Sequence, residues 1–137
     1  MSARRKARKR ALDVLFEAEQ RGVDALTLLA ERALAAEPPI APYTVVLVEG
    51  VVANRADIDT LLVAHLSEDW SLPRLPAVDR GLLRIACYEL RFSAEPIPAG
   101  VAIDEAVGLA QDLSTDDSPR FINGVLGAIA GLPAPST

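Results

Sequence analysis

Proline and glycine divide the chain into segments whose apolar residues repeat with the period of an α-helix. Ala and Leu, which favour helix, supply 42 of the 137 residues. The aromatic residues that enrich strands make up only 4% of the chain. The sequence therefore predicts an all-α fold, and its 50% content of apolar residues excludes a chain that is disordered throughout.

Three helices are predicted in the first half of the chain. The first runs from about Ala3 to Arg21 and ends at Gly22, and Asp24 can cap the second. The second helix has an apolar stripe that we expect to face the core, formed by Leu26, Leu29, Ala30, Ala33 and Leu34. A long third helix is predicted from about Tyr43 to Leu66, because helical spacing continues over its whole length.

Three further helices are predicted after a connector at residues 67–76, in which we expect Trp70 to fill the space between the two halves. They run over about 78–92, around 103–110, and from Ser118, the expected N-cap, to a stop at Gly131. Close helix packing is indicated by small residues at helical spacing, Gly124, Ala128 and Gly131.

We expect one domain over residues 1–137. Its parts are a basic arm at about 1–10, an N-terminal bundle to about 66, a C-terminal bundle at about 77–131 and a disordered tail at 132–137. Charge is distributed unevenly over these parts. The formal net charge is −5, yet the first ten residues carry +6 and the remaining 127 carry −11. An acidic body with a short cationic arm suggests an anionic partner at one end of the molecule.

The six cations of the arm surround most of a helical cylinder and leave an uncharged strip of about 120°, centred on Ala7. They oppose the helix dipole and repel one another at i, i+4. We therefore expect the first two turns to project from the body and to become ordered on binding a polyanion. Nucleic acid is the favoured partner, and the alternatives are a solvated terminus and attachment to a membrane surface. Phe16, on the same side as Arg5 and Lys9, is either a base-stacking platform or a core residue.

The start of the last predicted helix is a second candidate site. Ser118, Pro119, Arg120 and Phe121 combine free backbone N–H groups, a positive dipole end, an arginine and an aromatic ring outside the apolar stripe. This arrangement either holds a phosphate and stacks a base, or simply forms a well-capped helix end.

The remaining reactive residue types favour structural roles. His65, the single histidine, is expected to pack or cap at a helix end, and Cys87 is expected to be buried and inert. The carboxylate pairs at 57/59 and 116/117 point to different helix faces or serve a helix end. We expect no enzyme, cofactor or metal site. Since neither a membrane-spanning run nor a signal sequence is visible, we expect a cytoplasmic protein.

Several separated strings resemble the NusB family of transcription antitermination factors. They are RRKAR at residues 4–8 followed by Ala11 and Leu12, LVEGV at 47–51, WSLPRL at 70–75, VDRGLLRIACYEL at 78–90, IDEAV at 103–107 and FINGVL at 121–126. Their order and combination are specific, although no single string is. Asp104, Gly81 and Phe16 stand where this family usually has Asn, Ala and Tyr.

The resemblance implies an all-α fold of two perpendicular three-helix bundles. It implies binding to the boxA element of nascent RNA together with the ribosomal protein NusE, in a complex that helps RNA polymerase read through terminators, notably in ribosomal RNA operons. The NusE surface is expected mainly on the second bundle. The implied RNA surface consists of Arg4, Arg5, Lys6, Arg8, Lys9, Arg10, Asp117, Arg120 and Phe121.

Two functional alternatives remain at this point. One is a helical adaptor without RNA binding, and the other is the NusB-like domain that precedes RNA cytosine methyltransferase domains, although no methyltransferase sequence follows the last predicted helix. A homodimer that covers the arm is also compatible with the sequence.

Overall fold

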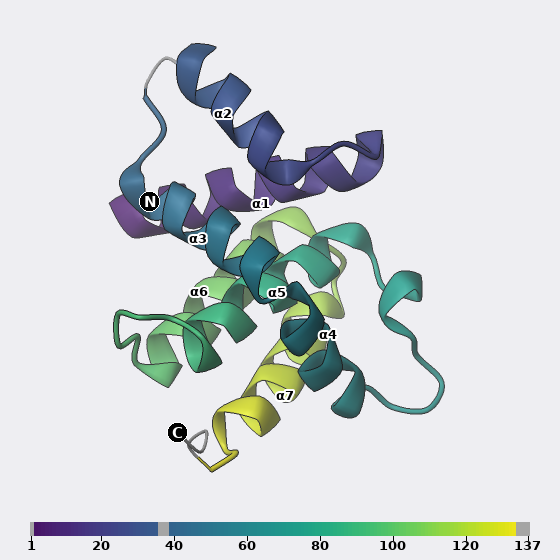
Figure 1. Ribbon diagram of the computed structural model, residues 1–137. Helices are drawn as coiled ribbons and strands as arrows, with labels where there is room; N and C mark the ends of the chain where they lie inside the picture. The colour runs from purple at the N-terminus through teal and green to yellow at the C-terminus, as the bar shows by residue number, and fades with distance from the viewer. Residues whose placement is uncertain (1, 36–38, 134–137) are drawn as a thin grey trace.

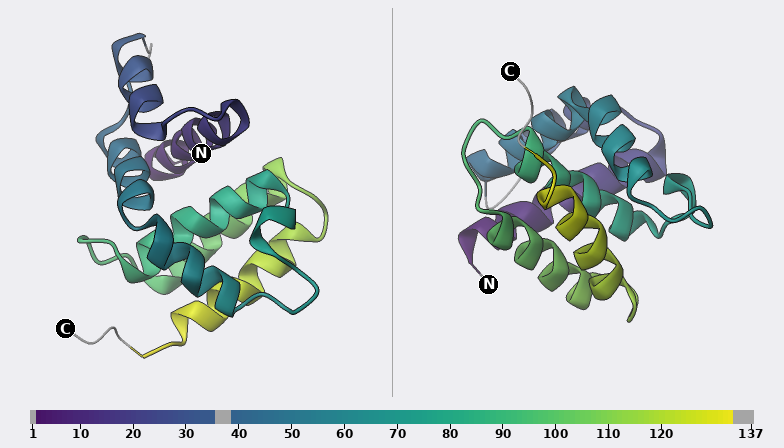
Figure 2. Two further views of the ribbon diagram at one scale, coloured as in Figure 1. Left: turned by 45° about the vertical axis from the view of Figure 1, so that its right-hand side comes forward. Right: turned by 90° about the horizontal axis from the view of Figure 1, so that it is seen from below.

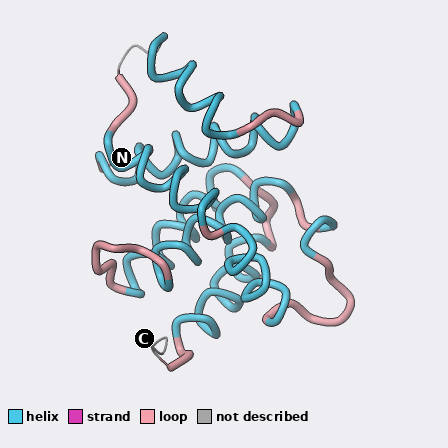
Figure 3. Tube along the Cα trace, in the orientation of Figure 1, coloured by secondary structure: helices cyan, strands magenta, loops and turns pink. Residues whose placement is uncertain are grey.

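The computed structural model describes residues 2–35 and 39–133, and helices account for most of them (Figures 1 and 3). The all-α prediction is confirmed, since no strand occurs within these two ranges. Much of the predicted tail, residues 134–137, lies outside the described part of the chain. The elements are α1 (Ala3–Arg21), α2 (Ala25–Ala35), α3 (Pro42–Ala53), α4 (Arg55–Ala64), a 3-10 turn (Leu72–Arg74), α5 (Ala77–Arg91), α6 (Ala99–Leu113) and α7 (Ser118–Ala130).

The helices form two groups that meet at helix α5. In the first group α1 packs against α2 and α3, and in the second α5 packs against α4, α6 and α7 (Figures 1 and 2). Helix α1 also lies along α5 and so joins the groups. One continuous core fills both, and its largest fully buried side chains include Leu47, Ile58, Leu62, Leu82, Leu83, Leu109, Ile122, Leu126 and Ile129.

The prediction of one long helix from Tyr43 to Leu66 is wrong, because this segment is divided at Asn54 into α3 and α4. The Asn54 side-chain amide donates to the Gly50 carbonyl at 2.8 Å, and the Asn54 backbone N–H donates to the same oxygen at 3.1 Å. Such a local side-chain bond offers the backbone an alternative to continued helix. The apolar spacing gave no sign of the break, because buried Val51 and buried Ile58 lie seven residues apart on either side of it.

The prediction of which α2 residues face the core is mostly wrong. Leu29 is buried as expected, but Leu28 is the other buried residue of this helix, and Leu34 is 92% exposed. Helix α2 lies at the edge of the first group and packs against α1 and α3, so a narrow face is enough to attach it (Figure 1). The predicted cap is confirmed, since Asp24 accepts hydrogen bonds from the Thr27 backbone N–H at 2.9 Å and hydroxyl at 2.8 Å.

Two packing expectations in the second half are also wrong. Trp70 is 48% exposed and does not fill the space between the two groups. Gly124 and Ala128 face solvent, and among the described residues no atom outside the neighbouring backbone of α7 lies within 4 Å of the position that a Cβ at Gly124 would take. The buried stripe of α7, which includes Ile122 and Leu126, occupies the opposite side of the helix and leaves these small residues without a neighbour.

Candidate nucleic-acid interface

The basic arm is the start of a regular helix that lies against the body. Helix α1 begins at Ala3, after Ser2, whose hydroxyl accepts a hydrogen bond from the Arg5 backbone N–H at 3.0 Å. Within residues 2–10, Ala7 and Arg8 are buried. The expectation that the first two turns project from the body is therefore wrong, and the reason lies in acidic side chains brought to the arm from distant parts of the chain.

Arg8 forms the centre of these contacts. Its side chain is 4% exposed and donates three hydrogen bonds, at 2.8–3.1 Å, to the Glu89 carboxylate of α5, which is 1% exposed. Glu105 of α6 lies 3.7 Å from the same guanidinium. Burial alone would lower the pKa of Arg8, but the hydrogen bonds and charge of Glu89 outweigh it and raise this pKa above its ordinary value. The ion pair of Arg8 with Glu89 therefore attaches α1 to the body.

Tyr43 of α3 completes the buried cluster. Its hydroxyl donates to the Glu89 carboxylate, and burial together with this hydrogen bond raises the pKa of Tyr43 well above its ordinary value of 10.0. Arg4 lies over the Tyr43 ring of α3, with its guanidinium carbon 3.8 Å from the ring centroid. Arg4 also donates to both carboxylate oxygens of Glu95, at 2.9 and 3.1 Å, and this bond raises the pKa of Arg4. The arm thus contacts α3, α5 and the loop after α5.

Arg5 attaches the arm to α6. Its guanidinium forms an ion pair with Glu105 and lies directly over Gly108, where an added Cβ would be 2.7 Å from a guanidinium nitrogen. The absence of a side chain at Gly108 is what permits this close approach. The Arg5 side chain remains 30% exposed and the Arg4 side chain 47% exposed, so both still reach solvent.

The other three cations of the arm lie on its opposite side. Lys6, Lys9 and Arg10 line a groove of about 420 Å³ between α1 and the segment that leads into α3, which includes Pro39, Ile40 and Ala41. Lys9 has one acidic contact, with Asp13 at 3.4 Å on the same exposed face. Among the described residues, Lys6 and Arg10 form no ion pair. Within residues 2–35 and 39–133, these three cations form no ion pair with another helix or loop.

At the start of α7, the prediction that Ser118 is the N-cap residue is wrong. Asp117 and not Ser118 is the N-cap residue, and it makes no side-chain capping bond. Ser118 is buried and its hydroxyl donates at 2.8 Å to the carboxylate of Asp79, a buried residue of α5 that also accepts from Ser114. An anionic carboxylate thus already occupies the positive end of the α7 dipole. Asp117 and Arg120 remain exposed, and Phe121 is half-buried against the core.

Helix α6 connects the arm to the start of α7. Arg5 lies over Gly108, and α6 ends five residues later, at Leu113, which is about 7.5 Å of helix rise. The turn at residues 114–117 then leads directly into α7 (Figure 2). Arg5 and the start of α7 are thus linked through α6, with Arg5 beside its Gly108 and α7 following its C-terminal end. Lys6 and Arg10 do not join them, because they face the groove on the α3 side of the arm.

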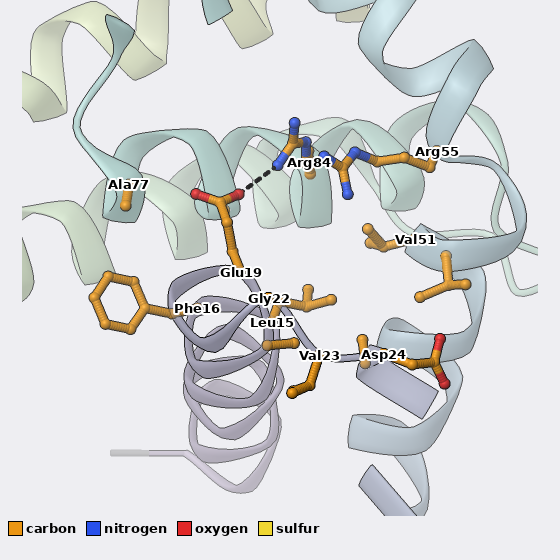
Figure 4. A pocket seen from close by; sticks show the side chains of 14 residues that line it. Leu15, Phe16, Glu19, Gly22, Val23, Asp24, Val51, Arg55, Ala77 and Arg84 are labelled. Carbon is orange, nitrogen blue, oxygen red and sulfur yellow. Dashed lines mark hydrogen bonds and ion pairs between the residues drawn. The ribbon is translucent and has the colours of Figure 1, made fainter. Parts of the chain in front are cut away.

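Phe16 lies on the rim of a separate cavity of about 410 Å³ between α1, α3 and α5 (Figure 4). Its ring is 41% exposed, which rules out the alternative of an interior core residue. Among the charged residues of the cavity wall, Glu19 pairs with Arg84, Arg55 pairs with Asp59 outside the wall, and Asp24 accepts hydrogen bonds from Thr27. Glu19 binds Arg80 and Arg84, and its hydrogen bond with Arg80 lowers the pKa of its carboxyl. The cavity therefore offers an aromatic edge and no uncompensated charge cluster.

The other reactive groups have structural roles. His65 is the C-cap residue of α4, with its Nδ1 2.9 Å from the Leu61 carbonyl oxygen. Cys87 is buried, and burial raises the pKa of its thiol to about 12. In the part of the chain that the structure describes, no three His, Cys, Asp or Glu side chains gather as a metal site would require. No helix there is long and apolar enough to cross a membrane.

Glu89, Glu95 and Glu105 are the residues that inspection of the sequence did not identify as part of this surface. Glu89 carries one recognisable signal, because it falls within the apolar stripe of α5, where an unpaired carboxylate would be costly to bury. Glu95 lies in an exposed loop and Glu105 is half-buried in α6, and neither position carries such a signal. Their partners in the arm lie 91 and 100 residues away in sequence.

The fold and this surface define a two-group, all-helical protein that presents a basic N-terminal helix on an acidic body. A family model described as the NusB family matches residues 5–131. The transcription antitermination protein NusB of Saccharopolyspora erythraea is 61% identical over 133 residues, which cover 96% of this chain and 89% of the relative. That of Kineococcus radiotolerans is 54% identical over 132 residues and 96% of each chain. The chain belongs to the NusB family.

Solved structures agree with this assignment. A structure of T. maritima NusB superposes with a TM-score of 0.85 at 37% identity, over 98% of this chain and 95% of that one. A structure of the antitermination factors NusB and NusE in complex with dsRNA includes a chain with a TM-score of 0.77 and 31% identity, over 93% of this chain and 95% of that one. The resemblance drawn from the sequence strings is thereby confirmed.

Proposed function

We propose that this protein is an RNA-binding transcription antitermination factor. It binds the boxA element of nascent RNA together with the ribosomal protein NusE, and the resulting complex promotes read-through by RNA polymerase, notably in ribosomal RNA operons. The observation that carries the proposal is the match to the NusB family over residues 5–131. The relative solved with NusE and dsRNA supports both partners.

The mechanism we propose is assembly and not catalysis. Exposed arginines and lysines of the arm attract phosphates, and the acidic remainder of the chain receives a basic ribosomal protein. The start of α7 supplies selectivity, with Phe121 as a stacking surface and the exposed Asp117 and Arg120 as polar contacts. A role on nascent transcripts places the protein in the cytoplasm.

Arg8 has a different role from the other residues of the proposed RNA surface. Its guanidinium is buried on Glu89, so it cannot reach a phosphate without leaving that ion pair. We propose that Arg8 positions the arm and that direct contacts come from Arg4, Arg5, Lys6, Lys9 and Arg10. Replacement of Arg8 by alanine is therefore expected to destabilise the fold, because it leaves the buried Glu89 carboxylate without its partner.

The test is a titration of the full chain with boxA RNA and with a scrambled RNA of equal length, each with and without NusE. We expect boxA to bind more tightly than the scrambled RNA and NusE to increase this difference. Equal affinity for the two RNAs under both conditions would contradict the proposal, and binding of neither RNA would favour a helical adaptor. Light scattering after size-exclusion chromatography, run on the same samples, shows whether the RNA-free protein is a monomer or a homodimer.

Phe121 provides the matched variants. Because the ring is half-buried against the core, Phe121→Ala removes packing as well as stacking. Phe121→Leu keeps an apolar side chain and removes only the aromatic face, so it serves as the cleaner variant. We expect both to weaken binding of boxA more than binding of the scrambled RNA. Equal losses on the two RNAs would remove the selectivity role of Phe121.

A further inference from the structure

Asp79 is a buried carboxylate that lies between α5 and the turn that leads into α7. It belongs to the first turn of α5 and is 3% exposed. Within residues 2–35 and 39–133, it forms no ion pair with a basic side chain. A carboxylate without a cationic partner is costly to bury unless hydrogen bonds satisfy it. The burial of Asp79 therefore depends on the groups that donate hydrogen bonds to it.

Two serine hydroxyls donate to this carboxylate. Ser114, the residue after α6, donates to Oδ1, and Ser118, the first residue of α7, donates to Oδ2 at 2.8 Å. The Ser118 oxygen also lies 3.0 Å from the Ser114 hydroxyl, but the shorter bond to a charged acceptor takes its proton. The Ser118 oxygen then accepts from Thr115, from the backbone N–H at 3.2 Å and from the hydroxyl at 2.7 Å. These three residues form a hydroxyl network (Ser114, Thr115 and Ser118) that joins the turn before α7 to α5.

The starts of two helices converge on Asp79. Its carboxylate belongs to the first turn of α5 and is bonded to the first residue of α7. The partial positive charge at the start of each helix favours a nearby carboxylate. Asp79 thus links two first turns that are 39 positions apart in sequence.

The first turn of α7 carries the residues that we propose to select the RNA. Asp117 directly precedes Ser118, and the backbone N–H of Phe121 donates to the Asp117 carbonyl at 3.2 Å. The Asp117 side chain makes no capping bond that would fix this turn from outside. Ile122 is fully buried and holds the following turn of α7 in the core. The bonds of the hydroxyl network to Asp79 fix the turn that precedes it.

We infer that Asp79 is a positioning residue for the selective RNA contact at the start of α7. It acts through Ser114 and Ser118, which hold Phe121 and its exposed neighbours in the arrangement that a stacked base requires. Asp79 itself does not touch RNA. The inference rests on the proposed function, and it assigns Asp79 to selectivity and not to general affinity, because the cations of the arm are held by other acidic residues.

The first test compares Asp79→Asn with the control Gly50→Ala. Asparagine keeps the size of the side chain, but its NH2 group cannot accept a hydrogen bond, so one of the two serines loses its acceptor. Gly50→Ala perturbs the core through the Tyr88 ring, on a later turn of α5, and does not touch the hydroxyl network. We expect Asp79→Asn to weaken binding of boxA about tenfold and to leave the scrambled RNA within about twofold, with an unchanged salt dependence. Gly50→Ala should weaken binding of neither RNA when the titration is run well below its Tm.

The second test asks whether Asp79 acts through the aromatic ring. Asp79→Asn is combined with Phe121→Leu, and the ratio of boxA affinity to scrambled-RNA affinity is measured for the unaltered protein, both single variants and the double variant. If Asp79 positions Phe121, Asp79→Asn should change this ratio by less than about twofold once the ring is absent. A residue that only stabilises the fold would lower the affinity for both RNAs and leave the ratio unchanged.

Ser118→Ala keeps the inference testable if Asp79→Asn does not fold. It removes the hydroxyl that joins α7 to the carboxylate and leaves the bond from Ser114 in place. We expect the same selective loss of boxA affinity, smaller in size. Hydrogen–deuterium exchange should become faster at the backbone amides of residues 115–121, and it should stay unchanged in α1.

The possible results separate this inference from the proposed function. If the unaltered protein prefers boxA and both Asp79→Asn and Ser118→Ala keep that preference, Asp79 has only a structural role and the proposed function stands. Equal losses on the two RNAs overturn the inference in the same way, and so does a loss of preference that is as large with Phe121→Leu as without it. If the unaltered protein does not distinguish the two RNAs with or without NusE, both fail together.

Discussion

Replacement of Arg8 by methionine gives the most demanding test of the arm's attachment to the body. Methionine keeps the apolar stem but removes three hydrogen bonds at 2.8–3.1 Å to Glu89, whose side chain is 1% exposed. Removing one partner of a buried ion pair leaves an uncompensated charge and costs about 3–5 kcal/mol. Domains of this size unfold with about 5–15 kcal/mol in total, so we expect loss of about a fifth or more of the stability. Urea unfolding followed by far-UV circular dichroism measures the change.

Glu89→Gln supplies the second half of a double-mutant cycle. Glutamine keeps an oxygen that can accept the Tyr43 hydroxyl and removes the buried charge, so Arg8→Met/Glu89→Gln should be more stable than Arg8→Met alone by at least about 1 kcal/mol. The reasoning fails if Arg8→Met costs less than about 1 kcal/mol while the dependence on urea stays unchanged. That result would mean that the arm projects into solvent, as its charge pattern alone predicts.

Four further changes test other parts of the structure. Gly50→Ala should lower the free energy of unfolding by about 1–3 kcal/mol, because its Cβ would overlap the Tyr88 ring, and urea unfolding would show it. Cys87 should react with a thiol reagent only after unfolding, since burial raises the pKa of its thiol to about 12; reaction in the native protein would contradict this. Leu34→Gln should change stability by less than about 0.5 kcal/mol, because Leu34 is 92% exposed, and a larger loss of Tm would reveal a covered face. Glu19→Gln should destabilise the protein at pH 7, and the difference should shrink as pH falls below 4.5 through the lowered pKa of Glu19; a difference that persists in acid would contradict the ion-pair origin.

The long helices could be predicted from the sequence because each has a local stop signal. The first helix ends at Gly22 in the left-handed conformation, with φ 65°, as its position after the last periodic residue predicts. Helices α5 and α7 begin after or within proline-containing segments and lie within one residue of the predicted bounds. The break at Asn54 could not be predicted, because it depends on a side-chain bond within a segment whose apolar period continues.

The candidate site was predictable in its residues and not in their arrangement. Clustered cations are visible in a sequence, but the ion pairs of Arg4, Arg5 and Arg8 join residues 81 to 100 positions apart. A helical wheel treats the arm as isolated and so counts its charges as unopposed. Only the fold shows which of the cations have carboxylate partners.

The acidic residues of the body explain why the arm is an ordered helix as well as why its charge differs from that of the rest of the chain. Cations at the start of α1 oppose the helix dipole by about 0.3–1 kcal/mol each when they are close to the end. Glu89, Glu95 and Glu105 offset this cost by pairing with three of them. A disordered segment loses conformational entropy when it binds, and this loss weakens its association. An arm that is helical before RNA arrives avoids that loss. The negative charge that appears to disfavour a nucleic-acid partner is therefore what holds the cationic helix in a binding-competent form.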